Sequence, residues 1–118
     1  MNMQIRKKVT KNHHNRGSLT CMLKKMKDEI ELLSRHVDVA RAVVDHQPIG
    51  IMKLSDLLAL PSHRIRYSLH VLEQMGYIRA SPDGAVATPQ ASQLFADLDD
   101  DLEDLIRLLN DMKKPPPK

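Results

Sequence analysis

The sequence predicts a mainly α-helical protein with a small β-hairpin, flanked by long N- and C-terminal helices. Hydrophobic residues make up 42% of the 118 positions and aromatic residues only 3%, so the core must consist of Leu, Ile, Val, Met and Ala. Such side chains suit helices better than a sandwich or a barrel. The length suits a single domain, which we place at residues 19–113.

Residues 54–75 predict two helices separated by a tight break. The first covers 56–59 with Ser55 as its cap and with Leu57 and Leu58 pointing inward. Pro61 cannot continue that helix, and Ser62 is a good N-cap for the next one. The second helix covers 62–75 because Ile65, Leu69 and Leu72 recur at i, i+4 and i+7. Gly76 ends it in the left-handed conformation that helix ends often require.

Two short strands follow this helix pair. Residues 77–80 have strand composition, Ser81-Pro82-Asp83-Gly84 predicts a turn, and residues 85–88 form the return strand. Ile49, Ile51 and Met52 alternate like a further short strand.

The order helix, turn, helix, hairpin is the layout of a winged helix-turn-helix. The segment LSDLLALPSHRIRYSLHVLEQMGYI resembles the helix-turn-helix of MarR, ArsR and PadR type regulators, and is most similar to small archaeal predicted transcriptional regulators. It matches their pattern in Leu72-Glu73-Gln74-Met75-Gly76-Tyr77-Ile78, and Ala87-Thr88-Pro89-Gln90-Ala91 is similar to the segment that leads their wings into the last helix. The resemblance implies a recognition helix at 62–75 and a strand near Ile49 that pairs with the wing.

The predicted recognition helix has a polar face opposite its apolar stripe. His63, Arg66, Tyr67, His70 and Gln74 fall on that face, which we interpret as free of acids, and Arg64 lies at its border. Arg and Gln suit base edges, whereas His, Tyr and Ser suit phosphates or bases. The predicted wing tip carries an acid, and its one basic residue, Arg79, lies in a strand. The DNA-binding residues we predict are Ser62, His63, Arg64, Arg66, Tyr67, His70 and Arg79.

Two long helices with heptad seams flank this region. The first covers residues 19–46, and a helix of 28 residues spans ~42 Å, longer than so small a domain needs. The second covers residues 89–113, with Thr88 as its cap, and carries a run of acids on its outer faces. Both seams are regular enough for a coiled-coil homodimer. The dimerisation residues we predict are Leu23, Met26, Ile30, Leu33, Val37, Leu98, Leu102, Leu105 and Leu109.

Charge is unevenly distributed along the chain, whose formal net charge is +3. Residues 1–25 carry seven basic residues and no acid, so residues 1–18 predict a disordered basic arm that follows phosphates or enters a minor groove. The basic start of the first helix (Lys24, Lys25, Lys27) and the acidic middle of the last (Asp100, Asp101, Asp104) favour an antiparallel mixed bundle. Residues 114–118 predict a disordered tail.

Several classes of function lack their residue patterns. No phosphate-binding glycine loop and no set of nucleophile, base and orienting group is present, so we expect no enzyme and no cofactor. His13-His14 has no further ligand at metal-binding spacing, so we expect no metal. The single Cys21 fits a reducing cytoplasm, and no apolar run predicts a membrane span.

These observations leave two hypotheses. The first is a cytoplasmic, sequence-specific DNA-binding transcriptional regulator of an archaeon or bacterium, acting as a homodimer on double-stranded DNA. The alternative is a winged-helix module for protein–protein interaction without sequence-specific DNA binding. The basic arm and the acid-free helix face favour the first, whereas the net charge of only +1 over residues 53–90 favours the second.

Overall fold

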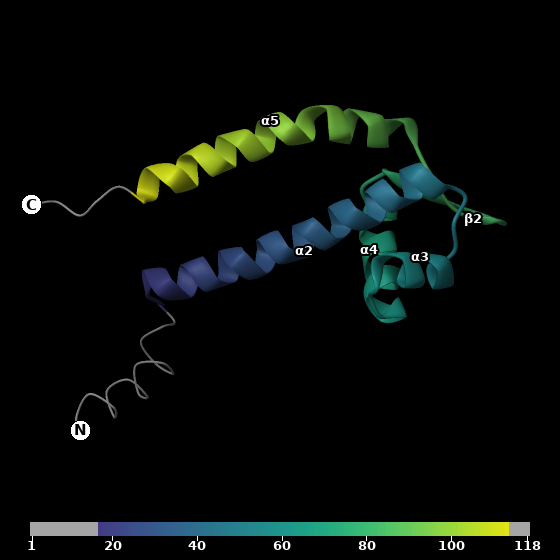
Figure 1. The fold of residues 1–118 in the computed structure, drawn as a ribbon, viewed down its shortest axis with the longest axis horizontal. Coiled ribbons are helices and arrows are strands. Elements are labelled where there is room, and N and C mark those ends of the chain that lie inside the picture. The colour runs from purple at the N-terminus through teal and green to yellow at the C-terminus, as the bar shows by residue number, and fades with distance from the viewer. Residues whose placement is uncertain (1–16, 114–118) are drawn as a thin grey trace, which may run out of the picture. The chain divides into compact units, whose positions relative to one another are not determined.

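The computed structural model describes residues 17–113, in a chain that divides into two compact units, Met1–Val37 and Asp38–Lys118. The division falls inside helix α2, Leu19–His46, which runs unbroken through both units (Figure 1). Residues 1–16 of the predicted arm and the whole predicted tail at 114–118 lie outside the described residues.

In the first unit, α2 is an exposed amphipathic helix. Ser18 Oγ accepts a hydrogen bond of 3.0 Å from the Cys21 N–H and so caps the first turn. Two ion pairs with i, i+4 spacing, Lys24–Asp28 at 3.7 Å and Lys27–Glu31 at 2.9 Å, lie on its surface. The hydrogen bond that Lys27 donates to the Glu31 carboxylate, together with the charge of that carboxylate, raises the pKa of Lys27.

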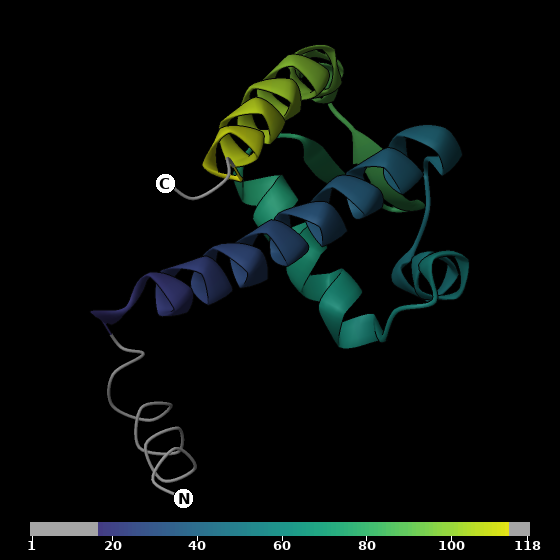
Figure 2. The same ribbon diagram turned by 60° about the vertical axis from the view of Figure 1, so that its left-hand side comes forward.

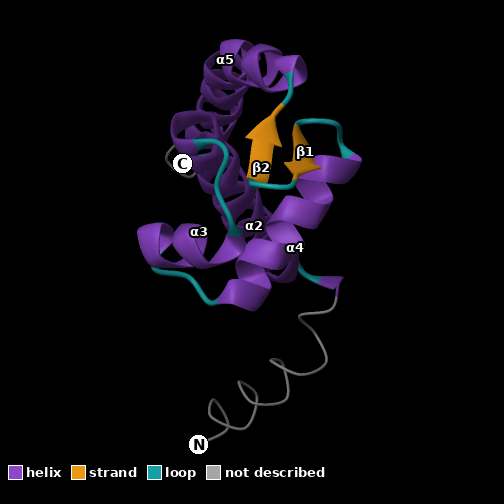
Figure 3. Cartoon of the chain, turned by 90° about the vertical axis from the view of Figure 1, so that its right-hand side faces the viewer, coloured by secondary structure: helices purple, strands orange, loops and turns teal. Residues whose placement is uncertain are grey.

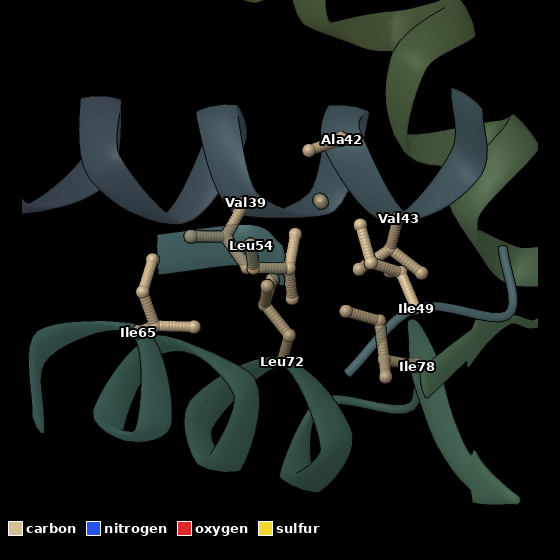
Figure 4. Packing of buried hydrophobic residues seen from close by; sticks show 9 residues of the cluster. Val39, Ala42, Val43, Ile49, Leu54, Ile65, Leu72 and Ile78 are labelled. Carbon is tan, nitrogen blue, oxygen red and sulfur yellow. The ribbon is translucent and has the colours of Figure 1, made fainter. Parts of the chain in front are cut away.

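The second unit is built around one apolar core. Val39 and Val43 of α2 meet Leu54, Ile65 and Leu72, which come from the next two helices (Figure 4). Those helices are α3, Ile51–Leu58, and α4, Ser62–Gln74. The apolar stripe that predicted α4 therefore faces the core. The fold is mainly α-helical, as expected.

The turn between α3 and α4 differs from the prediction in detail. Helix α3 begins at Ile51, five residues earlier than predicted, and Leu57 is exposed instead of pointing inward. Ser55 does not cap α3, because its hydroxyl donates to the Leu60 carbonyl and holds the turn after the helix. Ala59 ends α3 in the left-handed conformation, with φ at 56°. The two helices then run in different directions on either side of the turn (Figure 2).

The N-terminus of α4 also corrects the sequence interpretation. Pro61 occupies the N-cap position and Ser62 is the first helical residue, so Ser62 is not the cap, and no side chain caps α4. The Pro61 carbonyl accepts hydrogen bonds from the N–H groups of Arg64 and Ile65. The proline therefore starts the helix through its fixed φ, which is already close to the helical value.

The hairpin consists of β1, Ile78–Ser81, and β2, Gly84–Ala87, which pair antiparallel beside α4 (Figure 3). Both strands are shifted by one residue from the prediction. Ile49 pairs with Ala85 through an isolated bridge, whereas Ile51 and Met52 belong to α3. The expected strand near Ile49 is thus reduced to a single bridge to the hairpin.

Helix α5, Pro89–Met112, follows the hairpin directly. Thr88 stands at its N-cap position, but the Thr88 hydroxyl donates to the Gly76 carbonyl and leaves the helix without a side-chain cap. Ala91 is buried, and the Arg41 guanidinium lies 5.1 Å from the centre of the Phe95 ring. Ala91 and Phe95 thus pack the first turns of α5 against the rest of the second unit.

Candidate nucleic-acid interface

The polar face of α4 is open to solvent. Packing Ile65, Ser68 and Leu72 into the core leaves the opposite side of the helix uncovered, as its 3.6-residue period requires. Ser62, counted among the predicted contacts, is half-buried. The predicted residues that lie exposed on α4 are His63, Arg64, Arg66, Tyr67 and His70.

The guanidinium groups near this face form no ion pair with another described residue. Within residues 17–113, the ion pairs lie on α2 and α5, and Arg64, Arg66 and Arg79 take part in none of them. An arginine carries five N–H donors in a planar fork, which suits two parallel hydrogen bonds to one acceptor group. The face therefore offers donors to an external acceptor.

A groove of about 590 Å³ separates the second half of α4 from the hairpin. Arg66, His70 and Glu73 line one wall, at i, i+4 and i+7 along α4, and Pro82 and Asp83 of the hairpin turn line the other. The apolar side chains of Ile49, Ile51 and Leu69 also line this groove. The structure thus brings two predicted residues, Arg66 and His70, together with a part of the hairpin.

Arg79 is not brought into this groove. Side chains alternate between the two faces of a strand, and Ile78 and Ala80 are the β1 residues that line the groove before the turn. Arg79 therefore lies on the opposite face of the hairpin, where it is exposed. Arg79 is basic like Arg66, but it does not line the same groove.

Glu73 is a site residue that the sequence interpretation missed, and Asp83, the acid noted at the predicted wing tip, was not expected to share a groove with Arg66. The helix face was read as free of acids, yet Glu73 lines the same wall as Arg66 and His70. Glu73 follows His70 by three residues and Arg66 by seven, and this spacing in the sequence already places all three on one helix face. The two acids leave the groove with mixed charge, so an acceptor that binds Arg66 must avoid both carboxylates.

The predicted dimerisation residues divide into exposed and partly covered groups. Leu23, Met26, Ile30 and Leu33 are exposed on α2, and Val37 is half-buried. On α5, Leu102 is exposed, whereas Leu98, Leu105 and Leu109 are half-buried. Ala40, in line with the α2 seam, is buried in the core, whereas Val44, the next seam position, is exposed again.

The described residues contain no group of three or more His, Cys, Asp or Glu side chains placed to hold a metal ion. Among the helices from α2 to α5, none combines the length and apolar character needed to cross a membrane. No protein-family model matches the chain, and no curated protein matches it significantly.

Proposed function

We propose that the protein is a winged helix-turn-helix regulator that binds specific DNA sequences as a homodimer. The observation that carries this proposal is the exposed polar face of α4, whose Arg64 and Arg66 guanidiniums have no partner among the described residues. An α-helix fits the major groove, and an arginine there binds guanine O6 and N7 with two hydrogen bonds. In this arrangement α4 is the recognition helix.

The elements around α4 support the same assignment. A short α3, a tight turn at Ala59-Leu60-Pro61 and α4 follow one another as in a helix-turn-helix, in which the first helix crosses the DNA backbone. In this proposal the β1–β2 hairpin, which follows α4 directly, is the wing. Arg79, on the face of the hairpin away from the groove, would contact phosphate independently of Arg66.

A protein-interaction module is the second candidate function, and two observations favour it. Glu73 and Asp83 line the groove beside α4, and each would repel a nearby phosphate. The first turns of α2 also expose an apolar row that suits a protein partner. This alternative needs no sequence-specific contact with DNA.

The first experiment is selection from a random duplex pool at low salt, followed by anisotropy titrations on the selected and on random duplexes. Arg66→Ala is expected to reduce the preference for the selected duplex by ~1–3 kcal/mol, because one bidentate base contact is lost. Arg107→Ala is the matched control, since it removes the same charge from α5, where Arg107 pairs with Asp104 at 3.1 Å.

The outcomes separate the two candidate functions. An equal loss on every duplex would reduce Arg66 to a phosphate contact. Enrichment of no sequence, together with equal weak binding by both variants, would contradict the regulator proposal and leave the interaction module.

A further inference from the structure

The first turns of α2 combine an apolar row with positive charge. Leu19, Met22, Leu23 and Met26 have 75%, 56%, 54% and 40% of their surface exposed. They are spaced at i, i+3, i+4 and i+7 and therefore share one helix face. Lys24, Lys25 and Lys27 lie in the same segment, which has no acid between residues 19 and 27. Lys24 and Lys27 pair with Asp28 and Glu31 of the following turn, whereas Lys25 takes part in no ion pair among the described residues. This segment, called here the α2 start, thus resembles a basic amphipathic helix.

A second groove, of about 360 Å³, lies between the end of α4 and the first half of α5. Four apolar or aromatic side chains line it, and one of them, Met75, is 60% exposed. Asp97 and Asp101 line the same groove, and the Gln93 amide donates to Asp97 over 3.0 Å. Its full lining is Met75, Tyr77, Gln90, Gln93, Leu94, Asp97, Leu98 and Asp101. This recess is called here the α5 groove.

We infer that the α2 start of a second copy of the chain docks in the α5 groove. The nine residues of the α2 start span ~13 Å, and the groove follows α5 from Gln90 to Asp101 over ~16 Å, at 1.5 Å per residue. Methionines on both surfaces adapt to irregular apolar contacts. The inference rests on the homodimer in the proposed function, but not on DNA binding.

Charge selects this occupant over the other helices of the second copy. Between residues 89 and 106 α5 carries six acids and no base, so two α5 helices side by side would repel each other. Two α2 starts packed in parallel would bring three lysines against three. The lysines of the α2 start are attracted by Asp97 and Asp101 of the α5 groove. A two-fold axis would form the contact twice, once in each direction.

Intermolecular disulfide formation provides the test, because Cys21 is the single cysteine and lies in the α2 start. One sample carries only Cys21, and the other carries Cys21→Ser with Gln93→Cys, which places its thiol in the groove. After mixing and mild oxidation, a disulfide between the two proteins can only join separate copies. Cys21→Ser with Ser92→Cys is the control, because Ser92 is exposed next to Gln93 and does not line the groove.

We expect a crosslinked heterodimer with Gln93→Cys and about tenfold less with Ser92→Cys. A charge test is independent of cysteine: Asp97→Lys with Asp101→Lys is expected to weaken dimerisation about tenfold, and Lys24→Glu with Lys25→Glu on the same chain to restore it.

Equal crosslinking at the two positions, or none, in a protein that sediments as a dimer would overturn this docking and leave the homodimer standing. A wild-type protein that sediments as a monomer would overturn the homodimer as well. Neither measurement involves DNA, so DNA recognition is judged separately.

Discussion

Gly84 lies where the hairpin closely approaches the chain that leaves α2. Its φ is +131°, and a Cβ atom built there would lie 2.6 Å from the backbone carbonyl carbon of Ile49. Any side chain must therefore displace backbone, and only glycine adopts this conformation readily. The bridge between Ile49 and Ala85, next to Gly84, depends on this close approach.

Gly84→Ala is expected to lower the free energy of unfolding by ~1–3 kcal/mol, the usual cost of such a strained backbone position. Urea unfolding followed by circular dichroism measures it. Gly50→Ala is the matched control, because a Cβ at Gly50 meets nothing within 4 Å and the Gly50 φ is −92°. A change of similar size in both variants would mean that the contact with Ile49 is unimportant.

His36 makes the stability of the folded chain depend on pH. Burial lowers the pKa of His36 below its ordinary value of 6.5, and the charge of Arg35 lowers it further. Protonation thus favours the unfolded chain, and stability is lost as the pH falls through 6.5 toward the lower pKa of the folded state.

His36→Gln is expected to reduce the fall in unfolding temperature between neutral and mildly acidic pH. The reference substitution is His46→Gln, which removes an exposed imidazole at the end of the same helix. Thermal unfolding at several pH values decides between them, and parallel profiles for His36→Gln and wild type would reject the assignment.

At the scale of elements, α3 ends at a residue whose backbone conformation is unfavourable. Ala59 has a φ of 56°, and the left-handed conformation costs an L-residue roughly 1–2 kcal/mol. Ala59→Gly is expected to raise the free energy of unfolding by ~0.5–1 kcal/mol, because the relief of strain exceeds the greater freedom of glycine in the unfolded chain. Urea midpoints report the change.

Ala80→Gly serves as the comparison for Ala59→Gly. Ala80 is an exposed strand residue with ordinary backbone, so glycine there is expected to destabilise the protein. Destabilisation by both substitutions would show that Ala59 is not strained.

Helix positions followed from the sequence more reliably than helix caps. The heptad pattern and the Gln47-Pro48 stop gave the observed bounds of α2, and the apolar stripe of Ile65, Leu69 and Leu72 located α4. Ser55, Ser62 and Thr88 were all assigned as caps; Thr88 does occupy the N-cap position of α5, but none of the three makes a side-chain capping hydrogen bond. A hydroxyl can bond any nearby carbonyl, and the choice depends on a chain direction that is set by tertiary packing.

The site could be predicted only in part for the same reason. Exposure of His63, Arg66, Tyr67 and His70 follows from helical periodicity alone. The recess shared by Arg66, Glu73 and Asp83 requires the position of the hairpin relative to α4, which no local pattern encodes. Arg79 was predicted as a phosphate contact because it is the one basic residue of the hairpin, whereas the face on which it lies is decided by strand register.

At the scale of the whole molecule, apolar surface remains for a partner. Soluble monomers rarely expose long apolar stripes, and both α2 and α5 expose large apolar residues, among them Leu23, Leu33, Leu102 and Ile106. A two-fold dimer would place two α4 helices at a spacing ideally near ~34–36 Å, one turn of DNA apart.

Leu102→Asp with Leu105→Asp is expected to turn the dimer into a poorly folded monomer that no longer binds the selected duplex, because two charges would be buried in the interface. Sedimentation equilibrium measures the mass, and circular dichroism the folding. Leu57→Asp is the control for mass and folding, since it adds a charge at an exposed leucine of α3, outside the predicted dimerisation helices. Wild-type protein that is monomeric at micromolar concentration would end the dimer proposal.

The hydrogen bonds that hold the hairpin against its neighbouring segments should slow its amide hydrogen exchange. A two-stranded hairpin alone is marginally stable, but here the Thr88 N–H donates to the Tyr77 carbonyl, and Ile49 and Ala85 exchange two backbone hydrogen bonds of 3.1 and 2.8 Å. The Ala87 N–H donates to the Gln47 side chain over 2.8 Å. These amides cannot open without separating the hairpin from the ends of α2 and α4. Their protection should therefore match that of core amides such as Leu72, and the hairpin should exchange as part of one cooperative unit with α4.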